Sequence, residues 1–327
     1  RRARKIAMHT ILMTALLLIV GLDMLTAQVL YVSCSNGILR YNGATGAIID
    51  TFASAPSESY YGFTFGPDGN LYSCEWAQNR VVRYNGATGA PMPSPGNTGA
   101  TFVSSQAGGL SQPHKLAFGT DGKLYVGSVG TVNGVQRYNG TLGTFDTTFT
   151  TTPPAVYPYA ITFKPDSTGD LYVTSEHNIL RYDRRTGRPI PGTGAGAGIF
   201  ATDSAANTHY DLTFGPDGNL YVTAFETNKV LRFNGTTGAS MGDFVTAGSG
   251  GLDGPMGLAF GPDSNLYVVS ARTNQILKYS GSSGAFVGSF TSGTLPAVPR
   301  YLHFLEPSLE FNVTPRYIDG CCFEFDL

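Results

Sequence analysis

YDLTFGPDGNLYVTAFETNKVLRFNGTTGASMGDF, residues 210–244, contains short runs of strand-forming residues separated by turn residues. The runs 210–214, 220–224 and 229–233 are rich in aromatic and β-branched side chains, and a last short run ends near Val245. The segments between them are dense in Gly, Pro, Asp and Asn, which favour turns. We therefore predict four antiparallel strands that form one sheet.

The same unit recurs along the chain. A Leu-Tyr pair opens the second strand of every copy, at Leu30, Leu71, Leu124, Leu171, Leu220 and Leu266. A basic residue followed by Tyr or Phe marks the third strand, at Arg40, Arg83, Arg137, Arg181, Arg232 and Lys278. Four-stranded units that repeat about every 40 to 50 residues are typical of propeller blades. Six copies predict an all-β, six-bladed β-propeller of four-stranded antiparallel blades.

The first unit lacks an innermost strand, because no FGPDGN-like segment precedes residues 29–32. Residues 300–305, RYLHFL, resemble the first strands of the other units and are followed by no Leu-Tyr strand. We predict that this C-terminal strand joins the N-terminal blade and closes the ring, which removes the open sheet edges. The propeller then spans residues 28–307, and residues 308–327 form a tail.

The N-terminal segment 1–27 has a basic head, Arg1-Arg2-Ala3-Arg4-Lys5, an apolar centre and a small residue, Ala27, at its end. This order predicts a secretory signal peptide. The alternative is an uncleaved anchor, because the apolar part is close to the ~20 residues that cross a bilayer. Both predict a secreted, cell-surface or periplasmic propeller, with membrane contact only through this segment if it stays uncleaved.

Composition and charge restrict the partners. Charged residues make up 13% of the chain and the formal net charge is −2, so the sequence has no basic stripe. Nucleic acid is therefore not an expected partner. The 42 glycines and 19 prolines supply the many turns of an all-β ring.

The repeat G-[LI]-[AT]-F-G-P-D-G-N-L-Y-V…N-x-[VI]-x-[RK]-[YF] resembles that of the NHL-type six-bladed propellers. It is similar in particular to the exported bacterial branch that includes virginiamycin B lyase. The resemblance covers about residues 28–307 and implies the fold. Its implication for function is open, because such propellers include lyases, hydrolases and binding scaffolds.

The loops between second and third strands differ between units, whereas the GPDGN-type and NGxTG-type turns are nearly identical. Because successive strands reverse direction, these variable loops share one face, here called the loop face, and the similar turns share the opposite turn face. Variation marks the loop face as the functional one. The candidate ligand-binding residues there are Tyr61, Glu75, Trp76, His114, Tyr159, His177, Tyr210, Glu226, Arg272 and Arg300. They could bind a sugar, a peptide or a small polar ligand by stacking and hydrogen bonds. In the alternative interpretation, tyrosines fill the channel and the charged residues are solvated.

Two functions fit this pattern. We favour a binding or assembly scaffold for a protein or carbohydrate at the cell surface, without a cofactor, which could also form homo-oligomers. The alternative is a metal-dependent lyase of the virginiamycin B lyase type at the propeller mouth. It would use a divalent cation and His114, His177 or Glu176 as catalytic residues. A zinc site is not predicted, because three convergent histidines are not evident.

Four cysteines in an exported chain invite pairing. We predict Cys34–Cys74 as a candidate disulfide between blades one and two, if their Cα atoms approach within ~7 Å. The alternative is two separate buried thiols. Cys321 and Cys322 are adjacent, so they could form only a strained vicinal bridge or pair between chains.

Asn139, Asn234 and Asn312 match the glycosylation acceptor pattern, although the first two also belong to ordinary NGxTG turns. In the tail, apolar residues alternate with polar ones around Phe311 and Phe325, a strand pattern without a place in six blades. These strands could pair with a neighbouring molecule, or the tail could be loosely packed.

Overall fold

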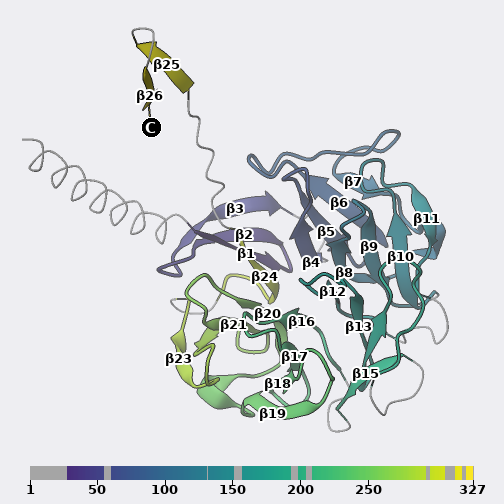
Figure 1. Cartoon of the computed structure of the whole chain (residues 1–327), viewed down its shortest axis with the longest axis vertical. Coiled ribbons are helices and arrows are strands. Elements are labelled where there is room, and N and C mark those ends of the chain that lie inside the picture. The colour runs from purple at the N-terminus through teal and green to yellow at the C-terminus, as the bar shows by residue number, and fades with distance from the viewer. Residues whose placement is uncertain are drawn as a thin grey trace, which may run out of the picture.

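The computed structural model describes residues 28–54, 60–130, 132–150, 157–192, 198–203, 208–291 and 295–305, and the backbone of 314–318 and 322–326. Six four-stranded antiparallel sheets surround a central axis (Figure 1), which confirms the predicted propeller. The predictions for the segment 1–27, for Asn312 and for the Cys321–Cys322 pair lie outside the described side chains.

In the first half of the ring, the strands of each blade run from the axis outwards. Blade one contains β24 (Pro299–Leu305), β1 (Val29–Cys34), β2 (Gly37–Asn42) and β3 (Ile48–Ser54). Blade two contains β4 (Tyr60–Phe65), β5 (Leu71–Glu75), β6 (Arg80–Tyr84) and β7 (Thr101–Val103). Blade three contains β8 (Pro113–Phe118), β9 (Leu124–Ser128), β10 (Gly134–Tyr138) and β11 (Phe145–Thr148).

The second half follows the same order. Blade four contains β12 (Ile161–Phe163), β13 (Leu171–Ser175), β14 (Asn178–Tyr182) and β15 (Ile199–Thr202). Blade five contains β16 (Leu212–Phe214), β17 (Leu220–Ala224), β18 (Lys229–Phe233) and β19 (Ser240–Val245). Blade six contains β20 (Pro255–Phe260), β21 (Leu266–Ser270), β22 (Gln275–Tyr279) and β23 (Phe286–Ser289).

The C-terminal strand β24 closes the ring as predicted. It pairs antiparallel with β1, with Phe304 opposite Leu30 and Leu302 opposite Val32. The Tyr301 backbone N–H also donates to Ser33 Oγ at 3.1 Å. Blade one is therefore built from both ends of the propeller, and its innermost strand is the last strand of the ring in sequence.

The repeated aromatic residues pack between neighbouring blades. Tyr72, the tyrosine of a Leu-Tyr pair, contacts Phe102 of its own outer strand and Phe118 of the next blade edge-on, with ring centroids 4.9 and 4.8 Å apart. Its hydroxyl donates to Asp68 Oδ2 of the GPDGN-type turn at 2.9 Å. The guanidinium of Arg83 lies 4.7 Å from the Phe102 ring. The aromatic and basic residues that recur in the repeat are thus packing residues.

Two innermost strands are shorter than expected. The run 210–214 predicted a five-residue strand, but β16 has three residues, as does β12 at the same position of blade four. At the entry to β12, Thr174 Oγ1 accepts the Ala160 backbone N–H at 2.9 Å, and Thr223 Oγ1 accepts that of Asp211 at 3.0 Å. A threonine side chain therefore replaces part of the backbone ladder at the loop-face end of both strands.

Beyond the ring, β25 (Thr314–Ile318) and β26 (Cys322–Asp326) form a two-stranded antiparallel sheet. Among the residues that the structure describes, no helix is long and apolar enough to cross a membrane.

Candidate functional site on the loop face

The innermost strands begin at the loop face, so their first residues gather around the axis. The position four residues before the first-strand Phe, or its counterpart in blade one, is occupied by Tyr61, His114, Tyr159, Tyr210, Met256 and Arg300. The structure brings the rings of this set together. The His114 centroid lies 4.6 Å from that of Tyr61 and 4.7 Å from that of Tyr159, and Tyr159 lies 5.1 Å from Tyr210. The register of the repeat therefore produces a continuous aromatic surface.

Arg300 and Trp76 extend this surface. The Arg300 guanidinium stacks 3.9 Å from the centroid of the Tyr61 ring, a cation–π contact. The Tyr61 ring also lies 6.0 Å from that of Trp76. We call Tyr61, Trp76, His114, Tyr159, Tyr210 and Arg300 the aromatic cup. Flat apolar faces beside a cation suit a ligand that stacks and carries hydrogen-bond acceptors.

His114 is the most enclosed member of the cup. Only 4% of it is exposed, and among the described residues its Nδ1 atom has no hydrogen-bond partner. Burial, reinforced by the positive charge of Arg300, lowers the pKa of His114 to about 3. The imidazole is therefore neutral at pH 7 and offers one donor and one acceptor nitrogen rather than a charge.

Arg272 and Glu226 lie on the rim of the cup. Arg272 Nη2 is 3.4 Å from Glu226 Oε2, and Nη1 is 3.1 Å from Asp253 Oδ1. The same guanidinium lies 4.5 Å from the Phe225 ring, which contacts Tyr210 edge-on at 4.8 Å. A short chain of aromatic contacts thus connects these exposed charges to the cup.

Glu75 does not belong to the cup. It is 1% exposed and forms an ion pair with Arg80 on the adjacent strand β6, whose Nη1 donates to Thr101 Oγ1 at 3.0 Å. The Glu75–Arg80 pair therefore links β5, β6 and β7. Glu75 is the last residue of the strand that begins with Leu71-Tyr72, so within the sheet it lies opposite Arg80, its cross-strand partner.

Glu176 and His177 form the turn between β13 and β14, and the structure places them next to His209 rather than His114. His209 is buried, and its Nε2 lies 4.0 Å from Asp203 Oδ2. Burial lowers the pKa of His209 to about 4, against the opposing effect of Asp203. His209 stands one residue before Tyr210, the residue at the repeat position, so it lies beside the cup and not in its ring of aromatic side chains.

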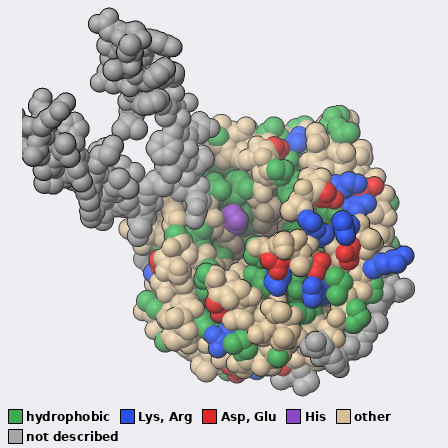
Figure 2. All heavy atoms as spheres, viewed as in Figure 1, with side chains coloured by type: hydrophobic (Ala, Val, Ile, Leu, Met, Phe, Trp, Pro, Cys, Tyr) green, Lys and Arg blue, Asp and Glu red, His purple; other side chains and the backbone are tan. Residues whose placement is uncertain are grey.

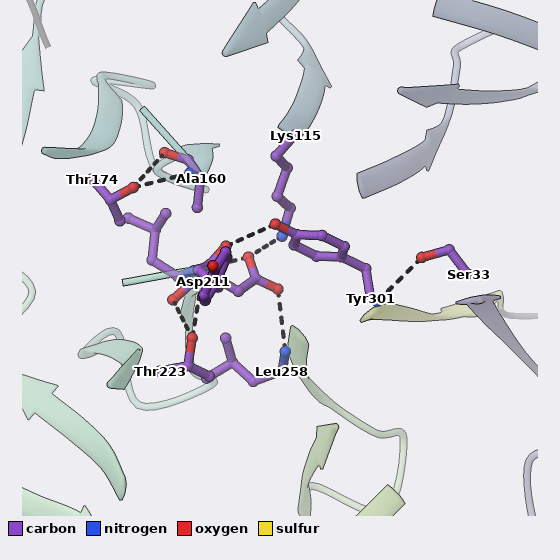
Figure 3. A network of polar contacts seen from close by, with 10 residues as sticks. Ser33, Lys115, Ala160, Thr174, Asp211, Thr223, Leu258 and Tyr301 are labelled. Carbon is purple, nitrogen blue, oxygen red and sulfur yellow. Dashed lines mark hydrogen bonds and ion pairs between the residues drawn. The ribbon is translucent and has the colours of Figure 1, made fainter. Parts of the chain in front are cut away.

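A buried ion pair lies beneath the cup and was not expected from the sequence. Lys115 Nζ of blade three pairs with the Asp211 carboxylate at the entry to blade five (Figure 3). Asp211 Oδ2 also accepts the Leu258 N–H of blade six at 3.1 Å. Tyr301 of blade one donates its hydroxyl to the Tyr210 carbonyl at 3.0 Å and lies under Lys115 Nζ, 5.3 Å from the ring centroid. This network crosses the axis and joins four blades.

Below the network, all six innermost strands line a cavity of about 180 Å³. Lys115, Tyr301 and His303 belong to its wall, together with Thr64, Thr162 and Thr213. Figure 2 shows a hollow near the middle of the ring with a histidine side chain inside it. Burial, followed by the charge of Lys115, lowers the pKa of His303 to about 4, so this wall carries a neutral imidazole at pH 7.

The two cysteines of the ring are free and buried, so the structure does not contain the expected disulfide. Cys34 packs with Tyr267 and other residues between blades one and six, whereas Cys74 packs with Leu116 between blades two and three. The two side chains do lie on opposite faces of their sheets. However, each faces away from the boundary between blades one and two, which Leu71 occupies instead.

Asn139 and Asn234 both stabilise their own turns. Asn139 Oδ1 accepts the backbone N–H of Thr141 at 2.9 Å and of Leu142 at 2.8 Å, and Asn234 Oδ1 accepts those of Thr236 and Thr237. These bonds explain why asparagine occupies the two turn positions without invoking a glycan, so glycosylation there stays a prediction.

These features define a six-bladed propeller with an aromatic, partly cationic surface at one mouth. No family model matches the chain, and no curated protein matches its sequence. Among solved structures, the chain is similar to a chain of a nidogen/laminin complex, with 16% identity and a TM-score of 0.66 over 85% of this chain and 98% of that chain.

Virginiamycin B lyase from Staphylococcus aureus is also similar, with 21% identity and a TM-score of 0.51 over 82% of this chain and 84% of that chain. A streptogramin B lyase structure shows 16% identity and a TM-score of 0.52 over 91% of this chain and 87% of that chain. At these identities the comparisons establish the fold alone.

Proposed function

We propose that the chain is an exported, NHL-type binding scaffold that holds a protein or carbohydrate ligand in the aromatic cup. The observation that carries the proposal is the convergence of the rings of Tyr61, His114, Tyr159 and Tyr210, with Arg300 stacked on Tyr61. Tyr, Trp and Arg are the residues that contribute most binding energy at interfaces. A similar ring occurs in a nidogen/laminin complex, a structure that contains two proteins.

The cup suits recognition because its members are already in place. His114 is held between two rings and is neutral, so it donates or accepts a hydrogen bond without first losing a charge. Arg300 is partly exposed and its guanidinium is already positioned over the Tyr61 ring, where it can donate to an acceptor on the ligand. Preorganised side chains lose little entropy on binding.

Trp76 provides the test, because it is the only tryptophan of the chain and lies beside Tyr61. Arrays of glycans and of extracellular protein fragments are screened with the full chain, and each hit is titrated by Trp76 fluorescence. We expect a hit whose affinity falls at least tenfold in Tyr61→Ala and Arg300→Ala. Arg188→Ala, an exposed residue on the turn face, is the control. Hits that bind both cup variants with unchanged affinity would refute a role for the cup.

Export and assembly are further parts of this proposal. If residues 1–27 are a signal peptide, the protein secreted by its source starts at Gln28, which intact-mass measurement detects. If the tail joins chains, deletion of 308–327 turns an oligomer into a monomer in native mass spectrometry. An uncut N-terminus, or equal masses per particle for both forms, would contradict the respective part.

A second candidate is a lyase at the same mouth, favoured by the proximity of His209 to Asp203, with His177 and Glu176 nearby. The divalent cation that this alternative implies does not fit the described residues, because no three His, Cys, Asp or Glu side chains among them converge. The histidine–carboxylate pair itself could take up a proton from a substrate.

The lyase candidate is tested with quinupristin, which appears in a structure of an inactive variant of virginiamycin B lyase. The chain is incubated with this compound, with and without Mg²⁺, and the products are separated by chromatography. A new product that disappears with His209→Ala, but persists with His303→Ala, would favour the lyase. Unchanged quinupristin in every sample would contradict the streptogramin-lyase form of this candidate.

A further inference from the structure

Blade four departs from the repeat on the turn face. Seven residues, KPDSTGD (164–170), separate its first two strands, whereas five do so in blades two, three, five and six. In the longer turn, Asp166 Oδ1 accepts the backbone N–H groups of Thr168 and Gly169 at 2.9 and 3.1 Å. As a result the buried hydroxyl of Tyr172 has no hydrogen-bond partner among the described residues, whereas Tyr125 of blade three donates to Asp121 at 2.9 Å. Blade four therefore lacks the tyrosine–aspartate hydrogen bond that blade three has.

The second turn of blade four has changed together with the first. It reads DRRTG (183–187), where the first and second blades read NGATG. A glycine is required at the second position elsewhere, because a Cβ at Gly86 would lie 1.7 Å from the Gly69 carbonyl oxygen. In blade four, Arg184 occupies this second position. The longer neighbouring turn leaves room for its side chain, because the nearest atom to a Cβ added at Gly169 would be Arg184 Cδ, at 3.0 Å.

Arg184 reaches across the boundary between blades three and four. Its Nη1 donates to Thr120 Oγ1 at 2.9 Å. Thr120 is itself a departure, because the equivalent turn position is proline in the other four blades that have this turn, at Pro67, Pro165, Pro216 and Pro262. Arg184 and Thr120, neither of which matches the residue usual at its repeat position, thus contact each other between blades three and four.

These residues surround a cavity of about 350 Å³, which is within the usual size of small-molecule sites. Its wall consists of Gly119, Thr120, Asp121, Tyr125, Phe163, Arg184 and Arg185. On the face shown in Figure 2, charged side chains gather most densely over the region of β8 to β13 in Figure 1.

The wall carries two guanidinium groups and the carboxylate of Asp121. In the part of the chain that the structure describes, no carboxylate forms an ion pair with Arg184 or Arg185. Asp121 of the wall accepts the Tyr125 hydroxyl and the Lys123 N–H, and Asp183 accepts the N–H groups of its own turn. Both carboxylates are thus held by their own turns, and only a longer-range attraction to Arg185 helps to lower the pKa of Asp183.

We propose that this cavity binds a small organic anion through Arg184 and Arg185, with Thr120 as an additional hydrogen-bonding group and Phe163 as an apolar wall. The ligand carries a carboxylate, sulfate or phosphate, because paired guanidinium groups match such oxyanions. This site lies on the turn face, opposite the aromatic cup, and is independent of the function proposed for the cup.

The test titrates the full chain with four probes that share one skeleton: glucuronic acid, glucose 6-sulfate, glucose 6-phosphate and glucose. Isothermal titration calorimetry at low salt should show binding of at least one anionic probe and none of glucose. Added salt should weaken the binding, since exposed charges are screened. The anionic probe that binds best identifies which oxyanion the site prefers. Failure of all three anionic probes, or equal binding of glucose, would overturn the proposal.

The variants follow from the repeat itself. Arg184→Gly with Arg185→Ala gives these two turn positions the residues of blades one and two, so we expect a normal fold by circular dichroism and at least tenfold weaker binding. Arg185→Ala alone removes one charge from the cavity without touching the turn packing. Arg188→Ala removes one charge from the same blade outside the cavity and should bind within twofold of the parent chain. Equal losses in Arg185→Ala and Arg188→Ala would show general attraction and refute a specific site.

Discussion

In blades two, three, five and six, the second-strand tyrosine combines apolar packing with a hydrogen bond from its hydroxyl to the turn aspartate. Tyr221 packs edge-on against Phe244 and Phe260, and its hydroxyl donates to Asp217 at 2.9 Å. Asp217 also accepts the Asn219 N–H, so one carboxylate both forms the turn and satisfies the tyrosine. The aspartate of the Pro-Asp-Gly turn is therefore linked to the tyrosine of the Leu-Tyr pair by a hydrogen bond.

We predict that Tyr221→Phe lowers the free energy of unfolding by about 1 kcal/mol, because the Asp217 bond is lost while the ring packing remains. Tyr172→Phe is the matched control, since the Tyr172 hydroxyl has no partner among the described residues. This control should stay within about 0.5 kcal/mol of the parent chain or exceed it. Urea unfolding measures both, and equal losses would contradict the assigned role of the bond.

The Lys115–Asp211 pair is the other decisive feature at the residue scale. Burial raises the pKa of Asp211 above its ordinary value, and the Lys115 charge opposes this rise. The ionised pair is thus held in the interior by mutual attraction and by the Leu212 and Leu258 N–H groups. Removal of one partner leaves an uncompensated charge.

We predict that Lys115→Met lowers the free energy of unfolding at pH 7 by about 3 kcal/mol. Without Lys115, the pKa of Asp211 in the folded chain rises further, while the unfolded value stays near ~3.9. The folded state then binds the proton first, so the variant should regain stability as pH falls from 7 toward that value. Urea unfolding at several pH values measures this.

The double variant Lys115→Met with Asp211→Asn tests the cause. It removes both charges and keeps an oxygen that can accept the Leu258 N–H, so it should recover most of the loss at pH 7. The double variant should also lack the rise in the free energy of unfolding that Lys115→Met shows as the pH falls. A double variant as unstable as Lys115→Met would assign the loss to packing instead.

The register of the repeat predicted which residues approach the axis, but not their partners. Tyr61, His114 and Tyr159 could be placed together because they occupy equal positions in successive units. Lys115 and Asp211 are 96 residues apart and come from blades that are not adjacent, so no local pattern pairs them. The predicted Cys34–Cys74 disulfide was wrong for a related reason. The alternation of side chains along a strand places the two cysteines on opposite sheet faces, but it does not tell which face meets which neighbouring blade.

At the scale of elements, the two turns of a blade are fitted to each other on the turn face. In blade two, the Gly86 N–H donates to Asn70 Oδ1 at 3.2 Å, and the chain passes so close to Gly69 that no side chain fits. The sequence predicted these turns from their Gly, Pro, Asp and Asn content. It could not predict their mutual contact, which depends on how the sheet twists.

We predict that Gly86→Ala lowers the free energy of unfolding by about 2 to 3 kcal/mol, because its Cβ would overlap the Gly69 carbonyl. Arg184→Ala occupies the same position of blade four and should be almost neutral for stability. Thermal unfolding followed by circular dichroism compares the two. A Gly86→Ala chain as stable as the parent would show that the turns can move apart.

At the scale of the whole molecule, stability depends on closing the ring, because each blade buries its faces only against its neighbours. Removal of β24 would expose β1 and the apolar cluster that Leu302 shares with Met256 and Val269. The sequence predicted this closure because a first-strand pattern was missing at one end and in excess at the other.

We predict that a chain ending at residue 298 lacks cooperative thermal unfolding, whereas a chain that ends at 307 unfolds within about 2 °C of the parent. Calorimetry measures both. A chain without β24 that unfolds like the full one would contradict closure by this strand.

Ring closure also sets the order in which the molecule can be made. Tyr301 contacts Ser33, a partner 268 residues earlier, so blade one waits for the end of translation while blades two to six are already complete in sequence. At ~5–20 residues per second, this delay lasts roughly 13 to 54 seconds. During that interval β1 has a free backbone edge, the feature that most readily recruits another chain. The newly made protein is therefore most exposed to aggregation just before its last strand arrives.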